Sequence, residues 1–221
     1  MPFVGKILRI AAAWGAACLM ALPVAAQNAH EAAVSSRHAD FAGQKASADA
    51  RYVAHWVMDA RDNRNLPFVI VDKKDARIFV FEADGRIRGT SPVLLGLMPG
   101  DLAAPGVTNK RDLTRLDLRE RTTPAGRFES EPGRNLKGEE VVWIDYNAAL
   151  AIHRLRPAPS YERRPERLAS STPDDNRISL GCVVVPVAFY EKVVQPTLGR
   201  ARSVVYVLPE SRSARDVFGV L

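Results

Sequence analysis

Two residues of this 221-residue chain, Cys182 and His153, have the types and the placement that nucleophilic catalysis requires. Cys182 follows Gly181 inside the apolar run Ile178–Val183, and a glycine there marks a bulge or a close backbone approach that can turn a thiol toward a cleft. His153 ends the apolar run Leu150–Ile152 and is the only histidine after residue 65. A thiol needs a base or a positive neighbour to become a thiolate near neutral pH, so the pair predicts a cysteine nucleophile with a histidine base.

The groups around the thiol have predicted roles as well. The backbone N–H groups of Gly181 and Cys182 are candidates for holding an oxyanion. Ser179 is a candidate for positioning the loop or the imidazole, and a plain strand serine is the alternative. We also expect a thiolate beside an imidazolium, titrating as one coupled pair. The alternative for the thiol is a small buried apolar side chain. One histidine and one cysteine cannot build a closed metal site, so no metal and no cofactor is expected.

The N-terminus predicts export. Two basic residues precede the apolar run Ile10–Leu22, and small residues end at Ala26, which is the pattern of a signal peptide over residues 1–26. An uncleaved anchor is the alternative, but the run is shorter than the roughly 20 residues that a membrane span needs. Cleavage would remove Cys18, leave Cys182 as a lone thiol in the periplasm or cell envelope, and lower the net charge from +6 to +4. A basic surface suits an anionic envelope polymer, and no nucleic-acid partner is expected.

Residues 27–65 predict a helical extension before the main domain. Ala50, Val53, Ala54 and Val57 recur at helical spacing and would share one face. Ser47 or Asp49 is the expected cap.

From Leu66 the apolar pattern changes to short runs rich in Val, Ile and Phe, separated by turn residues. The Asp84–Gly85 pair predicts a tight hairpin. The predicted strands are Phe68 to Asp72, Arg77 to Glu82, Arg86 to Leu95, Gly126 to Glu129, Val141 to Tyr146, Leu150 to His153, Ser179 to Val185 and Ser203 to Leu208. A loop is expected over Pro99 to Arg121 and a helix over Pro186 to Val194. The pattern favours a mainly β domain, a sandwich or partly closed barrel with short helices.

Two sequence blocks carry a resemblance to a known family. They are Thr123-Pro124-Ala125-Gly126-Arg127-Phe128 and Ser179-Leu180-Gly181-Cys182-Val183, with Ala151-Ile152-His153 between them. In this order, over about residues 66–209, they resemble the L,D-transpeptidase (YkuD-type) catalytic domain, leaving residues 210–221 as a C-terminal tail. The resemblance implies a β-sandwich-like fold and thioester chemistry on peptidoglycan stem peptides, with Cys182 as nucleophile and His153 as base.

The chain also departs from the family pattern. Leu180 stands where the family has a second histidine, and Val184 stands where the family has a polar residue. The gap between His153 and Cys182 is wide, and we interpret its polar segment as a flap over the cleft. Arg154 or Arg177 is the expected substitute for the missing polar substrate contact. The alternative for both arginines is a solvated loop charge.

The expected reaction is acyl transfer from a stem peptide through a thioester. The acceptor is the amine of a second stem, which makes a crosslink, or a lysine of an envelope protein, which anchors that protein. An L,D-carboxypeptidase or endopeptidase on the same scaffold is one alternative, since water would make the enzyme a hydrolase. A catalytically silent cell-wall binding module is the alternative from another class.

Overall fold

Eight strands hydrogen-bond into one curled sheet in the computed structural model, which describes Met1 and residues 38–103 and 117–219. Their order across the sheet is β3-β2-β1-β10-β5-β6-β7-β9. The bounds are β1 Phe68–Asp72, β2 Arg77–Phe81, β3 Ile87–Pro92, β5 Gly126–Arg134, β6 Glu140–Asp145, β7 Leu150–Arg154, β9 Val183–Val185 and β10 Ser203–Val207. Short β4 (Leu95–Gly96) and β8 (Arg177–Ser179) pair separately and in parallel.

The sheet nearly closes on itself. Val80 of β2, near one end of the strand order, and Val183 of β9, at the other end, belong to the same apolar core. Beyond β3, Leu94 forms an antiparallel bridge to Val184. The Leu94 N–H donates to Val184 O with a nitrogen–oxygen distance of 2.8 Å, and the Val184 N–H donates to Leu94 O at 2.9 Å. The concave face therefore encloses one core, and the prediction of a mainly β, partly closed fold is confirmed.

Helices close the ends and the outer side of the sheet. They are α2 Ala48–Ala60, α3 Arg164–Ala169, α4 Val187–Phe189, α5 Gln195–Leu198 and α6 Ala214–Phe218, with a π-helical turn η6 Tyr190–Val194 and 3-10 turns η3 Leu118–Glu120, η4 Ser160–Glu162 and η5 Pro173–Asn176. The helix predicted over Pro186 to Val194 is found, but it continues through the π-helical turn to Leu198. Tyr190, Val194 and Leu198 of this run seal the concave core.

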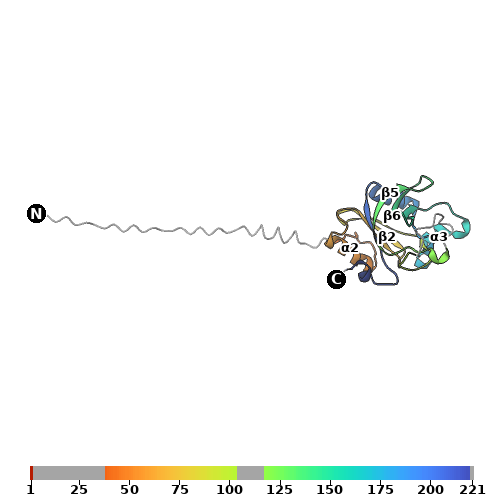
Figure 1. Ribbon diagram of the computed structural model, residues 1–221, viewed down its shortest axis with the longest axis horizontal. Helices are drawn as coiled ribbons and strands as arrows, with labels where there is room; N and C mark the ends of the chain where they lie inside the picture. Colours follow the sequence, from red (N-terminus) through yellow and green to blue (C-terminus); the bar gives the residue numbers. More distant parts are fainter. Residues whose placement is uncertain (2–37, 104–116, 220–221) are drawn as a thin grey trace. The chain divides into compact units, whose positions relative to one another are not determined.

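Helix α2 covers the outer face of β1, β2 and β10 (Figure 1). Its N-cap is Ser47, whose hydroxyl accepts a hydrogen bond from the Ala50 N–H at 3.0 Å, so the expected cap is confirmed. Val53 and Val57 are fully buried on the predicted apolar face. Burying a valine contributes about 1.5 to 3 kcal/mol, so packing on the sheet, more than helix propensity, stabilises α2.

The C-terminal helix α6 lies beside α2. The rings of Phe218 and Trp56 are 6.3 Å apart, and the Arg215 guanidinium lies 4.2 Å from the centre of the Tyr52 ring. Residues 210–219 of the predicted tail therefore pack against the rest of the unit, which runs from Arg37 to Leu221.

The predicted hairpin at Asp84–Gly85 is present between β2 and β3. Gly85 has φ +86° and donates its N–H to Glu82 O at 3.0 Å. A Cβ added at Gly85 would meet the flexible end of the Met58 side chain at 2.9 Å, so it is the positive φ of the turn that favours glycine there.

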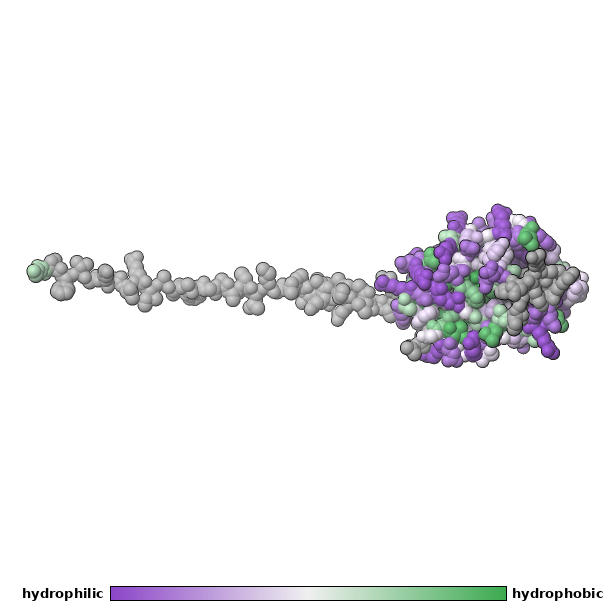
Figure 2. Space-filling view, in the orientation of Figure 1, coloured by the Kyte–Doolittle hydropathy of each residue, from purple (hydrophilic) through white to green (hydrophobic). Residues whose placement is uncertain are grey.

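Several sequence predictions fall outside the described residues. They are the signal peptide beyond Met1 with Cys18, residues 27–37 of the predicted helical extension, residues 104–116 of the expected loop, and residues 220–221 of the predicted tail. Among the described residues, no helix has the length and apolar character needed to cross a membrane. Hydrophilic residues dominate the face shown in Figure 2, where hydrophobic ones gather in small areas.

Candidate functional site

Cys182 lies in a tight turn between β8 and β9. The single strand predicted over Ser179 to Val185 is wrong, because the chain leaves the strand path after Ser179 and returns at Val183. The Ser179 hydroxyl donates to the Cys182 carbonyl at 2.7 Å and accepts the Gly181 N–H at 3.1 Å. Ser179 thus ties the turn together and leaves Cys182 partly exposed.

The turn requires glycine at position 181. Gly181 has φ +135°, and a Cβ there would lie 2.9 Å from the carbonyl oxygen of Thr122. Its N–H is already bonded to Ser179, so it is not a free donor for an oxyanion. The Cys182 N–H is the remaining candidate for that role.

His153 and Cys182 come from neighbouring parallel strands. In the β7–β9 ladder, His153 pairs with Val184, two residues after Cys182. Because strand residues alternate between faces, His153 and Val184 point away from the concave core that holds Ile152 and Val183. The thiol lies beside β7, where its Sγ is 3.5 Å from Ala149 O. The fold therefore brings the two predicted catalytic residues to the same edge of the sheet.

The His153 ring is oriented by a backbone carbonyl. Its Nδ1 lies 2.8 Å from the carbonyl oxygen of Arg154. A carbonyl can only accept, so Nδ1 carries the proton and Nε2 is the nitrogen that can accept one. The residue is only 7% exposed, and burial, with the nearby Arg156 cation, lowers the pKa of His153 to about 4. The imidazole is therefore a neutral base at pH 7.

The thiol is neutral as well. Burial raises the pKa of Cys182, and this effect outweighs a hydrogen bond with the Ala151 backbone and the Arg156 charge, which both favour the thiolate. Burial shifts each pKa toward the neutral form, which is the direction opposite to the thiolate and imidazolium expected from the sequence. Proton transfer has to accompany attack.

A charged pair that the sequence analysis missed stands near the imidazole. Arg156 Nε and Glu139 Oε2 are 2.8 Å apart, and Asn135 Nδ2 donates to the same carboxylate at 2.6 Å. The bond from Asn135, and next the Arg156 charge, lower the pKa of Glu139. Their charges act on His153 in opposite directions. No motif pointed to this pair, since Glu139 comes from the β5–β6 hairpin and Arg156 from the segment after β7.

The two arginines predicted to contact substrate have protein partners. Arg154 is 3.6 Å from Glu140, 3.7 Å from Glu191, and 4.8 Å above the Tyr190 ring. Arg177 is ion-paired with Glu210 and donates to Lys73 O at 3.0 Å. Neither guanidinium is therefore a plain solvated loop charge, and any substrate contact would share the guanidinium with these protein partners.

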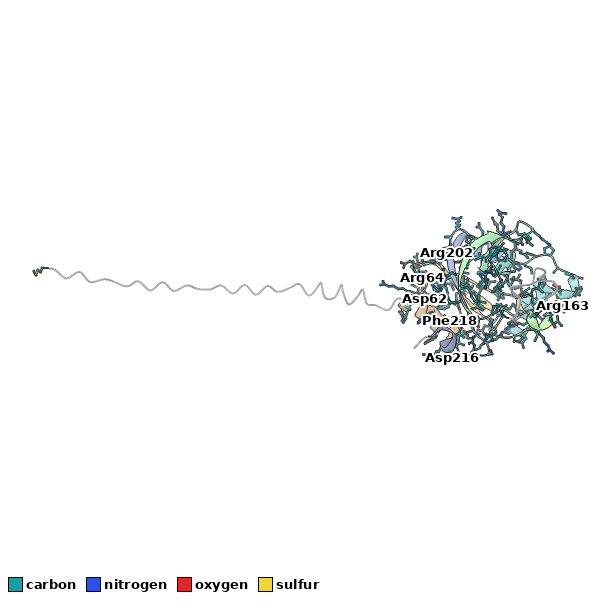
Figure 3. The ribbon with its side chains drawn as sticks, in the orientation of Figure 1. Asp62, Arg64, Arg163, Arg202, Asp216 and Phe218 are labelled. Atoms are coloured by element: carbon teal, nitrogen blue, oxygen red, sulfur yellow. The ribbon has the colours of Figure 1, made fainter. Side chains whose placement is uncertain are left out.

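The segment between β7 and β8, expected as a flap, is organised around a small apolar cluster. Leu168 of α3 packs with Leu94 and Val184. Asn176 at its far end is buried and donates to Val93 O at 2.9 Å. Figure 3 shows Arg163 of this flap at the opposite end of the unit from Asp62, which follows α2.

Across residues 38–103 and 117–219, no group of three or more His, Cys, Asp or Glu side chains is arranged to hold a metal ion.

No protein-family model and no curated protein matches this chain. Similar solved structures include an L,D-transpeptidase from Xylanimonas cellulosilytica, 16% identical with a TM-score of 0.41, covering 64% of this chain and 60% of that one. The helical cell shape determining protein Pgp2 from Campylobacter jejuni is 18% identical with a TM-score of 0.39, covering 67% and 49%. An Enterococcus faecium L,D-transpeptidase is 17% identical with a TM-score of 0.34, covering 64% and 49%.

This chain therefore spans between half and three fifths of the length of those solved chains. Most of them are L,D-transpeptidases, the family that the sequence blocks resemble. The chemistry at Cys182 has to be argued from the residues of this chain.

Proposed function

We propose that this protein is a cysteine acyltransferase of the cell envelope, an L,D-transpeptidase that acts on peptidoglycan stem peptides. The observation that carries the proposal is the arrangement at the sheet edge. Cys182 lies in a tight turn beside β7, and the neutral imidazole of His153 on β7 keeps Nε2 free because Arg154 O holds Nδ1. A nucleophile, a base and a group that orients the base are the parts that acyl transfer requires.

The first half of the reaction forms the thioester. As the thiol of Cys182 attacks the carbonyl at the L-centre of the diamino acid, its proton passes to Nε2 of His153. The new C–S bond replaces the peptide C–N bond, and the imidazolium returns its proton to the leaving amine of D-alanine. The Cys182 N–H is the proposed donor to the oxyanion.

The second half transfers the acyl group. An amine of a second stem, or a lysine of an envelope protein, attacks the thioester and loses a proton to His153. The C–N bond forms, the C–S bond breaks, and the sulfur recovers its proton from the imidazolium. If water attacks instead, the same steps give hydrolysis.

The resting neutral pair suits this sequence of proton transfers. With a pKa near 4, the imidazole is unprotonated at pH 7 but is a weak base, so it takes the thiol proton only as the C–S bond forms, and the imidazolium that it becomes is a strong acid toward the leaving amine. The buried thiol avoids standing as a thiolate in an oxidising compartment, where it would be open to oxidation.

The test is incubation of the protein with purified tetrapeptide muropeptides, followed by mass analysis of the products. The proposal predicts release of D-alanine together with a crosslinked dimer, and neither product with Cys182→Ala. Release of D-alanine with a tripeptide monomer alone would show a hydrolase. If the wild-type protein released no D-alanine, the proposal would be contradicted, and the remaining candidate would be a catalytically silent cell-wall binding module.

A further inference from the structure

We infer that Thr123 is a positioning residue for catalysis, because its hydroxyl orients the N–H of Cys182. The inference rests on the proposed role of Cys182 as nucleophile. Thr123 is fully buried in the segment between η3 and β5. Its Oγ1 donates to Gly181 O at 2.7 Å and accepts the Gly96 N–H at 2.9 Å. Donating and accepting at once, the hydroxyl is held in one orientation.

The consequence follows from the geometry of a peptide unit. The carbonyl of Gly181 and the N–H of Cys182 belong to the same planar trans peptide, so they point in opposite directions. When Thr123 holds that carbonyl on the buried side, the Cys182 N–H is directed to the other side. That N–H is the donor proposed for the oxyanion, since the Gly181 N–H is bonded to Ser179.

The backbone around Thr123 leaves little room for this peptide to rotate. A Cβ at Gly181 would meet Thr122 O at 2.9 Å, and a Cβ at Gly96 would meet Arg121 O at 2.5 Å. Leu97 N–H donates to Ser179 O at 3.0 Å, so the β4 segment also holds the start of the nucleophile turn. The three segments touch backbone to backbone, with the Thr123 hydroxyl at their junction.

The backbone of Thr123 is held in place by the buried Lys73 side chain. Its carbonyl accepts a hydrogen bond at 3.0 Å from Lys73 Nζ, and the Lys73 side chain has no solvent exposure. The same ammonium lies 3.0 Å from Asp101 and 3.3 Å from Glu210. A buried cation with two carboxylate partners is costly to move, so Thr123 stands on a rigid support.

The experiment compares acylation of the thiol by imipenem in the full chain and three variants. Thr123→Val keeps the shape and removes the hydroxyl, and Thr123→Ser keeps the hydroxyl and removes the methyl. Ser130→Ala is the matched control, because it removes an equally buried hydroxyl whose partner is Ser203 Oγ at 2.6 Å, within the β5–β10 pair. The maximal acylation rate and the imipenem concentration at half-maximal rate are measured for each.

We expect Thr123→Val to lower the maximal acylation rate by at least about tenfold, because small misplacements of catalytic groups are that costly. The half-saturating concentration should stay unchanged, since Thr123 does not contact the ligand. Thr123→Ser should recover most of the rate, and Ser130→Ala should lose none. Thr123→Ala repeats the test if Thr123→Val does not fold.

A maximal rate in Thr123→Val or Thr123→Ala equal to that of the wild type would overturn the inference, as would a loss that Thr123→Ser does not restore. Failure of the proposed function looks different, because the wild-type protein would then form no adduct at Cys182 at all.

Discussion

The two ends of the folded unit differ in the proportion of apolar and polar residues that they bury. At the α2 end, a large apolar cluster is rich in aromatic rings, with Phe68 stacked on Phe81 at 4.7 Å, and the buried polar residues Asn63 and Asp72 lie at the ends of the helix. At the thiol end, the apolar cluster consists of Leu94, Leu168 and Val184 with two partly buried neighbours. The comparison teaches that the first region mainly buries apolar surface, which stabilises the fold, whereas the second holds buried polar groups in fixed hydrogen bonds, as the proposed chemistry requires.

The buried polar residues of the thiol end make this division concrete. His153, Thr123, Ser179 and Asn176 are all at most 7% exposed, and each has a hydrogen bond to a backbone group. Satisfied buried polar groups fix one geometry, whereas an apolar core tolerates several packings. Changes at the two ends should therefore have separable effects on stability and on chemistry.

The largest expected effect is the loss of chemistry in Cys182→Ala. Thioester formation needs the sulfur, so turnover on stem peptides should fall below detection. Because alanine fills most of the space of a partly exposed cysteine, the near-ultraviolet circular dichroism and Tm should match the wild type. Turnover at the wild-type rate would remove the thiol from the account.

The second prediction concerns Phe68→Ala at the α2 end, which should reduce stability without affecting the chemistry at Cys182. Removing this fully buried ring should lower the free energy of unfolding by about 3 to 5 kcal/mol, measured by denaturant titration. The imipenem acylation rate of the protein that remains folded should be unchanged. A proportional loss of acylation in fully folded protein would break the separation between the two ends.

An intermediate effect is expected on the pH dependence of stability. The pKa of His153 is about 4 in the folded protein and near 6.5 when unfolded, so the unfolded state binds the proton more readily. The free energy of unfolding should therefore fall as the pH is lowered from about 6.5 to about 4. Neutral, buried His153 accounts for about 3 kcal/mol of this loss.

His153→Gln should remove that part of the pH dependence and also slow acylation. The variant is compared with wild type by urea titration at several pH values between 4 and 7, so that other titrating groups cancel. Parallel stability curves for the two proteins would show that His153 is not buried in its neutral form.

The smallest expected effect comes from Leu168→Ala in the flap. Leu168 anchors α3 on Leu94 and Val184, so its truncation should let the flap open locally with little change in global stability. We expect KM for the stem peptide to rise several-fold with kcat nearly unchanged. An unchanged KM would mean that the flap does not cover bound substrate. Ser130→Ala serves as the control for a general loss of packing.

The sequence predicted the regular elements better than the site. Phe68–Asp72, the Asp84–Gly85 turn and the Ser47 cap depend on neighbours in the chain, and all three are found. The close backbone approach expected at Gly181 is found, but the length of the break between Ser179 and Val183 was missed because the residues on either side form a continuous apolar pattern. It depends on Thr122, nearly sixty residues away in sequence.

Dependence on residues distant in the sequence also explains why some residues received no predicted role. Lys73 received no predicted role, because its burial depends on Asp101 and Glu210, which come from distant parts of the chain. Thr123 stood inside a quoted sequence block, but nothing local showed that its hydroxyl meets Gly181. The neutral state of His153 and Cys182 required the burial that only the fold supplies.

The central claim is that Cys182 carries the acyl group, and intact-protein mass after rapid acid quench tests it most directly. Wild-type protein mixed with a tetrapeptide stem should gain the mass of the stem that has lost D-alanine. Peptide mapping should place that mass on Cys182, and Cys182→Ala should gain none. Release of D-alanine by a protein whose Cys182 stays unmodified throughout the time course, or an adduct on another residue, would contradict the account.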